Sequence, residues 1–258
     1  LAILQGERGG VFVRSDDTQY QFKTIEYITE GESFALNFGQ HPPAPIDQQK
    51  QITAATWRLN AYQGDWQVPA LRHRQWMHEA LGPADRSEMP AWVSNIELVI
   101  SCPFYNSDME AGILGKLSQL VDPEKTLLYA QDWREAGWAL NYPDYTPVTS
   151  FANFGDFLRE AKRYGFRVMP HANMVAVSLS NPLYGEFEKY QMRHPWTGEK
   201  IGSRLNNGYP LRVQYAWINS ASHSYRKMFV EALKNVWEIY QVDAFHLDIS
   251  SYIVNNAP

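Results

Sequence analysis

Polar and apolar residues alternate over short runs near the start of the chain, which is the pattern of strands with one buried face. Gln21–Ile25 (QFKTI) is the clearest such run, and acidic segments containing glycine, such as Glu30–Glu32, separate it from its neighbours. Between Trp66 and Leu81 the apolar spacing changes to three or four residues, which predicts an amphipathic helix. We therefore expect residues 1–82 to form a β-rich segment that ends in a connecting helix.

From residue 91 onward the pattern predicts strands and helices in alternation. Strands are expected at Val93–Ser101, Thr126–Gln131, Phe166–Pro170 and Val242–Ile249, with helices at Met109–Val121, Ala152–Tyr164 and Ser222–Tyr240. This alternation predicts an α/β class in which parallel strands are joined by right-handed crossovers. About forty residues, Met174–Tyr215, separate the third strand from its helix, and connections this long usually serve a function or are disordered.

Composition narrows the class of protein. The 258 residues carry a formal net charge of −5 and no dense basic run, which argues against nucleic acid as the main partner. No apolar run approaches the ~18 residues of a membrane span. A single cysteine, Cys102, excludes an internal disulfide, and the lack of phosphate-binding glycine motifs argues against a nucleotide cofactor. Aromatic residues reach 14%, enough to supply stacking platforms for sugars as well as a core.

The segment Asp243–Asp248 (DAFHLD) carries the sharpest chemical signal. His246 and Asp248 share one face of the predicted strand, and Asp248 lies at its C-terminal end. Barrel enzymes place catalytic carboxylates at that end, where a carboxylate can act as a glycosidase nucleophile or as an acid–base group. The structural alternative is an aspartate that caps a helix or pairs with a cation.

Two other predicted strands end in residues that suit a sugar site. Asp132 and Trp133 follow the second strand, with Trp138 nearby, so a carboxylate for sugar hydroxyls would stand beside stacking walls. His171 and Asn173 share one parity at the end of the third strand and could both face the same opening. The alternative is that these side chains are buried anchors of the loops.

The sequence does not predict a metal site. His171, His246 and Asp248 lie on separate strands and could converge as ligands, but no HxH or HExxH run supports them. Cys102 is interpreted as a small buried group, because no neighbour in the sequence would activate it as a nucleophile. We therefore expect neither a metal nor a cofactor.

Several motifs, taken in order, resemble those of a known group of proteins. The motifs are Gly64–Trp66 with Trp76, Tyr142–Tyr145 (YPDY), Gly165–Pro170 (GFRVMP) and Asp243–Asp248. Over most of residues 60–258 the chain resembles the uncharacterised glycoside-hydrolase-like (β/α)8-barrel family. That family is similar in layout to retaining α-glycosidases such as α-galactosidases and α-amylases.

The resemblance implies a fold and a role for one residue. In such relatives the fourth strand ends in the nucleophilic aspartate, a role that maps onto Asp248, and the acid–base carboxylate follows a sixth strand that has no counterpart here. The implied fold is a partial TIM-type barrel of about four βα units over residues 91–258, preceded by the end of a β-sandwich. The chain opens at Leu1 without a starting Met or a signal-peptide pattern, and we expect it to be an inactive fragment.

The function expected for the parent protein is glycoside hydrolysis. Asp248 would be the nucleophile, and the sugar subsite would be shaped by Asp132, Trp133, Trp138, His171, Asn173 and His246. Two alternatives remain: a non-catalytic carbohydrate-binding protein, and a metal-assisted barrel enzyme with His171 and His246 as ligands. The expected partner is a carbohydrate, with no nucleic acid and no membrane, and the exposed edges of a half barrel also suggest a homodimer.

Overall fold

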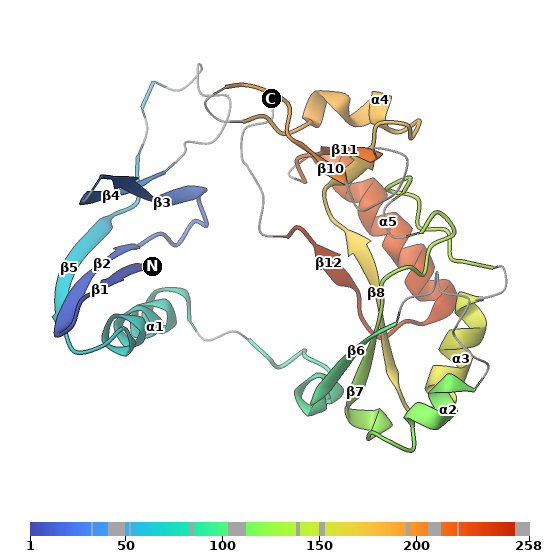
Figure 1. The fold of residues 1–258 in the computed structure, drawn as a ribbon. Helices are drawn as coiled ribbons and strands as arrows, with labels where there is room; N and C mark the ends of the chain where they lie inside the picture. The colour runs from blue at the N-terminus through green and yellow to red at the C-terminus, as the bar shows by residue number, and fades with distance from the viewer. Residues whose placement is uncertain are drawn as a thin grey trace. The chain divides into compact units, whose positions relative to one another are not determined.

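A computed structural model describes residues 1–31, 33–40, 50–51, 53–82, 85–102, 112–137, 140–149, 153–194, 197–205, 213–220 and 222–250. The chain divides into two compact units, Leu1–Glu88 and Met89–Pro258 (Figure 1). Among the described residues, no helix is both long enough and apolar enough to cross a membrane.

The first unit is built from antiparallel strands and one helix. Strands β1 (Ala2–Gln5), β2 (Gly9–Ser15) and β5 (Trp57–Gln63) form one sheet in the order β1-β2-β5, and β3 (Lys23–Glu30) pairs with β4 (Ser33–Gln40) as a hairpin. The hairpin turns at Gly31, whose φ of 62° suits a residue without a Cβ. Helix α1 (Gln67–Leu81) follows β5 and ends at Gly82, as the sequence predicts.

The second unit contains a parallel sheet with its strands in chain order. β6 (Leu98–Cys102), β7 (Thr126–Ala130), β8 (Arg167–Asn173) and β12 (His246–Asp248) lie side by side in that order. All three pairings are parallel, and the last one sets His246 opposite His171 and Asp248 opposite Asn173. The expected mixed α/β class is therefore confirmed.

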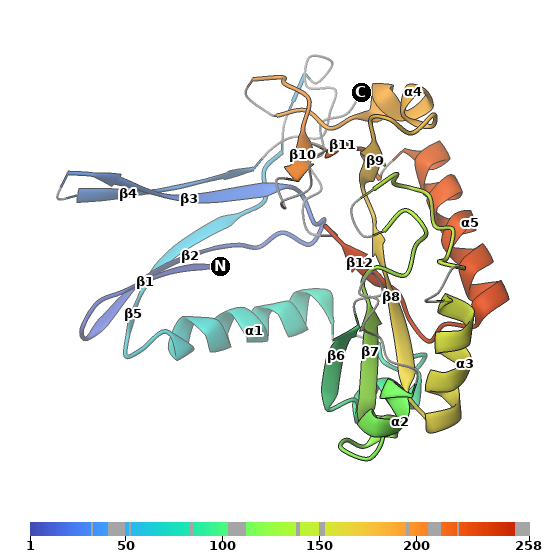
Figure 2. The same cartoon turned by 45° about the vertical axis from the view of Figure 1, so that its right-hand side comes forward.

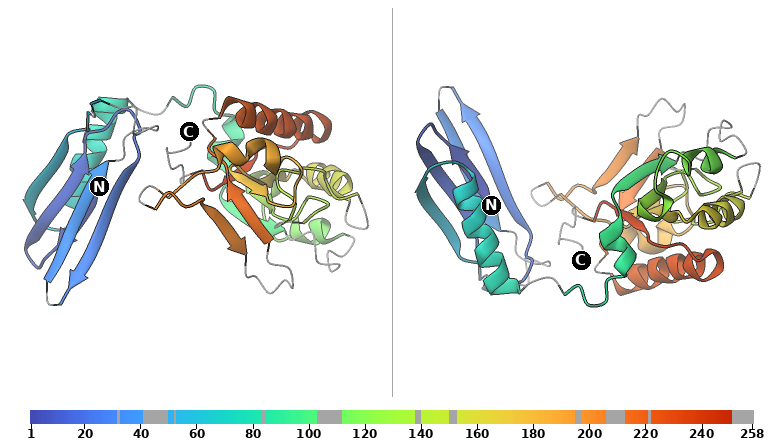
Figure 3. Two further views of the ribbon diagram at one scale, coloured as in Figure 1. Left: turned by 90° about the horizontal axis from the view of Figure 1, so that it is seen from above. Right: turned by 90° about the horizontal axis from the view of Figure 1, so that it is seen from below.

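Three helices cover one face of this sheet: α2 (Ile113–Leu117), α3 (Phe154–Tyr164) and α5 (His223–Tyr240). They lie beside one another in chain order on that face (Figures 2 and 3). Helix α3 shows why the sequence specifies them, because Asn153 caps its first turn and Gly165 ends it in the left-handed conformation. The apolar side of α3 packs with strand residues Leu128, Ala130, Val168 and Ala172 in the main core.

Several predicted boundaries were wrong: β3 begins at Lys23 rather than Gln21, and β12 begins at His246 rather than Val242. The first strand begins at Leu98, not Val93, and Ala91–Asn95 form a short 3-10 helix, η2. The neighbouring strand β7 begins only at Thr126, opposite Leu98, so the residues before Leu98 are not part of the β6–β7 ladder. The described helix at the predicted Met109–Val121 is only Ile113–Leu117, and residues 103–111 lie outside the described ones.

The long connection after β8 has a structure of its own. Strands β9 (Ala176–Ser178), β10 (Gly202–Leu205) and β11 (Val213–Trp217) form an antiparallel sheet in the order β10-β11-β9, accompanied by α4 (Tyr184–Phe187) and the 3-10 helix η4 (Glu188–Tyr190). A second apolar cluster joins this sheet to α5, and its buried members are Val177, Phe187, Ala216, Ile218 and Tyr225. The connection is therefore packed onto the sheet at the C-terminal end of β8 (Figures 1 and 2).

Candidate active site

The C-terminal ends of β7, β8 and β12 bring several predicted residues together. Leu128 and Ala172 lie in the core shared with the helices, and strand alternation therefore turns Tyr129 and His171 to the other face of the sheet. The register of β8 and β12 places His246 beside His171 and Asp248 beside Asn173. The sequence predicts a shared face for His246 with Asp248 and for His171 with Asn173, and the parallel register brings these two pairs together.

A direct contact joins Asp248 to Asn173. Nδ2 of Asn173 lies 3.4 Å from Oδ2 of Asp248, and the backbone N–H of Met174 donates to the Asp248 carbonyl at 3.2 Å. Asn173 is buried, whereas Asp248 is half-buried. The carboxylate therefore combines a held position with some access to solvent.

His171 and His246 stack face to face beside Tyr129. Their ring centroids lie 5.4 Å apart with an interplanar angle of 22°, and the Tyr129 hydroxyl lies 2.7 Å from Nδ1 of His171. Burial, assisted by the nearby charges of His246 and Arg134, lowers the pKa of His171 to about 3. His171 is therefore neutral at ordinary pH and cannot serve there as a cationic acid.

Tyr129 lies near both candidate carboxylates, Asp248 and Asp132. Burial raises its pKa to about 12, and the negative charges of Asp248 and Asp132 act in the same direction. The hydroxyl therefore stays protonated and can donate a hydrogen bond. Sequence reasoning missed Tyr129, although its parity relative to buried Leu128 and Ala130 on the predicted strand could have identified it.

Trp133 does not fit its predicted role as a stacking wall. Its side chain is completely buried (0% exposed), and its ring stacks on Tyr145 at a centroid distance of 6.3 Å. The indole N–H donates to the His171 carbonyl at 2.7 Å, one residue beyond the last β7–β8 pair, Ala130 with Pro170. Trp133 thus continues the ladder and supports the end of β8, and Trp138 lies outside the described residues.

A buried arginine organises the loop after β7. Arg134 donates from Nη1 to the Asp144 carbonyl and from Nη2 to the Gly137 carbonyl, both at 2.7 Å. Its guanidinium carbon lies 3.8 Å from the ring centroid of Tyr142, a cation–π contact. The Tyr142 ring packs edge-on against Tyr215 of β11 at 5.7 Å. The loop and the sheet of the long connection are therefore packed together above the strand ends.

Asp132 is buried at the end of β7. It is close enough to Tyr129 for its charge to act on that hydroxyl, so β7 contributes one carboxylate to this region and β12 contributes another.

Metal binding and thiol chemistry were the alternatives for residues at these strand ends. Among the described residues no group of three or more His, Cys, Asp or Glu side chains is arranged to hold a metal ion. Burial raises the pKa of the Cys102 thiol to about 11, which keeps it protonated and poorly nucleophilic.

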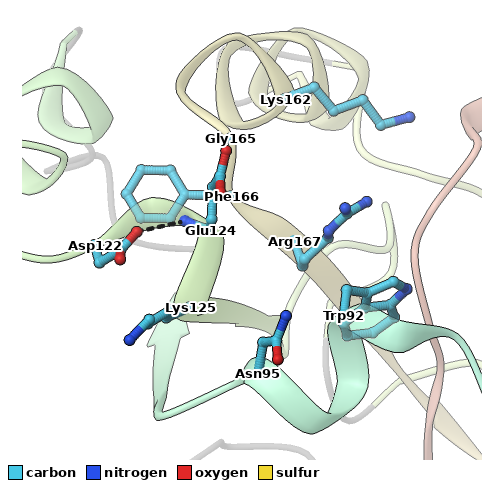
Figure 4. Close-up of a pocket in the computed structure, with 9 residues that line it drawn as sticks. All are labelled: Trp92, Asn95, Asp122, Glu124, Lys125, Lys162, Gly165, Phe166 and Arg167. Atoms are coloured by element: carbon cyan, nitrogen blue, oxygen red, sulfur yellow. Dashed lines mark hydrogen bonds between the residues drawn. The ribbon is translucent and has the colours of Figure 1, made fainter.

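A well-formed pocket of about 570 Å³ lies elsewhere in the second unit. Asp122 and Lys125 line it just before β7, and Arg167 lines it at the start of β8 (Figure 4). This is the N-terminal end of the strands, opposite to the end that carries His171 and Asp248. The pocket therefore does not belong to the candidate active site.

Solved structures of two glycosidases share this fold. Ligand-free α-N-acetylgalactosaminidase NagBb from Bifidobacterium bifidum matches with a TM-score of 0.64 and 11% identity, covering 95% of this chain and 44% of that one. α-Galactosidase TtGalA from Thermus thermophilus, in complex with stachyose, matches with a TM-score of 0.58 and 14% identity, covering 96% and 46%. The expected resemblance to glycoside hydrolases is therefore confirmed at the level of the fold.

The chain spans less than half the length of the two glycosidases. No curated protein matches the sequence. A family model described as "Domain of unknown function (DUF6259)" matches residues 54–255, which is most of the chain. The chain belongs to this family.

Proposed function

We propose that the full-length protein is a retaining glycoside hydrolase and that Asp248 is its nucleophile. The parallel strands β6, β7, β8 and β12 would be the first four strands of a (β/α)8 barrel. Their spatial order follows the chain and their helices share one face, as a barrel requires. The β-rich first unit would be the end of a β-sandwich that precedes the barrel.

One observation carries the proposal: Asp248 ends β12 opposite Asn173, on the face of the sheet that also carries the stacked rings of His171 and His246. The C-terminal ends of barrel strands are where such enzymes assemble their sites. Asp132, His171 and His246 would shape the sugar subsite, with the protonated Tyr129 as a further hydrogen-bond donor.

The chemistry assigned to Asp248 is a double displacement. One carboxylate oxygen bonds to the anomeric carbon while the glycosidic C–O bond breaks, and the leaving oxygen takes a proton from a second carboxylic acid. Water then attacks the anomeric carbon and releases Asp248, with the second group acting as base. Retaining enzymes place the two carboxyl groups about 5 Å apart. The acid–base group would belong to a later barrel strand, so we expect no turnover by the 258-residue chain alone.

The test uses the full-length protein with aryl α-galactosides and aryl α-N-acetylgalactosaminides, the sugars named by the two similar structures. Asp248→Asn is expected to abolish turnover while sugar binding persists. Asp248→Gly with added azide is expected to recover turnover and yield a glycosyl azide, because azide replaces the missing nucleophile. Asp122→Asn is the matched control, since Asp122 caps η3 (Pro123–Lys125) before β7 and asparagine caps a helix equally well.

The outcomes separate the remaining functions. Full turnover by Asp248→Asn would refute the proposal. Sugar binding without turnover by the wild-type protein would instead indicate a non-catalytic carbohydrate-binding protein. Loss of wild-type turnover on treatment with a chelator would favour the metal-assisted alternative.

A further inference from the structure

The side-chain amide of Asn173 is engaged at both of its ends. Its Oδ1 accepts hydrogen bonds from the backbone N–H groups of Val175 at 3.1 Å and Ala176 at 2.9 Å. Its Nδ2 points to Oδ2 of Asp248 at 3.4 Å. The residue is only 5% exposed. Both polar atoms of the Asn173 amide are therefore already engaged with groups of the protein.

These contacts allow one orientation of the amide. An amide oxygen can accept from two donors, whereas an amide NH2 group cannot accept at all. A flipped Asn173 would set its NH2 against two backbone donors and its oxygen against a carboxylate oxygen. The orientation in which Oδ1 accepts from the N–H groups of Val175 and Ala176 is thus the one in which Nδ2 donates to Asp248.

The backbone around this contact is fixed as well. The Tyr145 hydroxyl donates to the Asn173 carbonyl at 3.0 Å, and the Met174 N–H donates to the Asp248 carbonyl at 3.2 Å. Asn173 and Asp248 are also direct partners in the β8–β12 register. The side chain of Asn173 is held by its bonds to Val175 and Ala176, and its backbone is held by the sheet. Asn173 is therefore a rigid hydrogen-bond donor to Asp248.

We propose that Asn173 is a positioning residue that holds Oδ2 of Asp248 and so leaves Oδ1 as the nucleophilic oxygen. This inference rests on the proposed function and assigns Asn173 a role other than the expected sugar contact. A carboxylate held by one oxygen keeps the other in the near-attack geometry on which the rate of the covalent step depends. A freely rotating carboxylate would present either oxygen in many orientations.

Asn173→Asp in the full-length protein tests the donor separately from the turn. The new Oδ1 can still accept from Val175 and Ala176, but an oxygen now faces Asp248 in place of the N–H. We expect kcat to fall at least tenfold with little change in KM, and the acidic limb of the kcat/KM profile to move to higher pH. That movement would follow from two carboxylates facing each other, which a purely structural role of Asn173 would not produce.

Asn153→Asp is the matched control. Asn153 also accepts a backbone N–H through Oδ1, from Asp156 at 3.1 Å, at the start of α3. This control is expected to keep wild-type kcat and pH profile. Wild-type kcat in Asn173→Asp, or a loss explained by a fall in Tm that abolishes folding at the assay temperature, would overturn the positioning role.

A second measurement does not depend on activity. In full-length protein labelled with 15N-asparagine, the side-chain NH2 protons of Asn173 are expected to shift between wild type and Asp248→Ala, while those of Asn153 stay in place. An unchanged Asn173 signal would refute the contact even if Asp248 is the nucleophile. Conversely, turnover that survives Asp248→Asn would refute the proposed function and leave this contact intact.

Discussion

Mild acid should destabilise the second unit through His171. The pKa of this side chain falls from 6.5 to about 3 in the folded protein, mainly because the ring is buried. The unfolded chain therefore binds a proton at a pH where the folded chain does not. The stability that depends on a neutral His171 is fully present above pH 6.5 and is lost as the pH falls from 6.5 toward 3.

The size of the effect follows from these two values. Each pH unit below 6.5 costs about 1.4 kcal/mol until the folded-state pKa is reached. Between pH 7.5 and pH 5.0 the free energy of unfolding should therefore fall by about 2 kcal/mol because of this one group. That is a large part of the ~5–15 kcal/mol by which ordinary domains are stable.

The assay is urea unfolding of the wild type and of His171→Gln at pH 7.5 and pH 5.0. Glutamine does not titrate, so the variant should lose about 2 kcal/mol less than the wild type over this interval, whatever its stability at pH 7.5. The first unit has the same sequence in both proteins, and its contribution cancels in the comparison. His223→Gln, at an exposed position in α5, controls for the loss of a histidine as such. An equal loss in wild type and His171→Gln would refute the reasoning.

Two further predictions concern other strands of the same sheet. Tyr129→Phe removes the hydroxyl that lies 2.7 Å from Nδ1 of His171 without changing the ring, and should lower the free energy of unfolding by about 1–2 kcal/mol in urea titrations; no change would show that the contact is not formed. β6 and β12 are the outermost strands of the described sheet, and Val99 on β6 is 54% exposed, so we propose that the 258-residue chain forms a dimer through these edges. Light scattering across micromolar concentrations should then give twice the mass of the chain, and a monomeric mass throughout would contradict it.

The elements best predicted from the sequence are those whose signals are local. Helix α3 has an apolar stripe, a capping Asn153 and a terminating Gly165, and all three lie within a few residues of the helix that they define. The parallel direction of β7 and β8 follows from the helix between them. The helix returns the chain to the end of the sheet at which β7 begins, so β8 runs in the same direction as β7.

Elements whose limits depend on distant partners were predicted less well. The residues near Val93 do not indicate that β6 begins only at Leu98, because the start of β6 is set by its partner β7, about thirty residues later in the chain. The long connection after β8 has the same difficulty. Its strand β9 pairs with β11, which lies beyond α4, η4 and β10 in the chain, so no local pattern in the sequence indicates this pairing.

The candidate site divides in the same way. Strand parity is a local property, so it was enough to group His246 with Asp248 and His171 with Asn173, and the parallel register then joined the two pairs. Trp133 lies beyond the last paired residue of β7, where alternation no longer says which way a side chain turns. The indole points inward and donates to the carbonyl of His171, which lies one residue beyond the last β7–β8 pair. This bond satisfies a buried backbone acceptor. A tryptophan just after a strand end is therefore better interpreted first as a completion of the ladder, and as a sugar platform only where the neighbouring strand already has its donors.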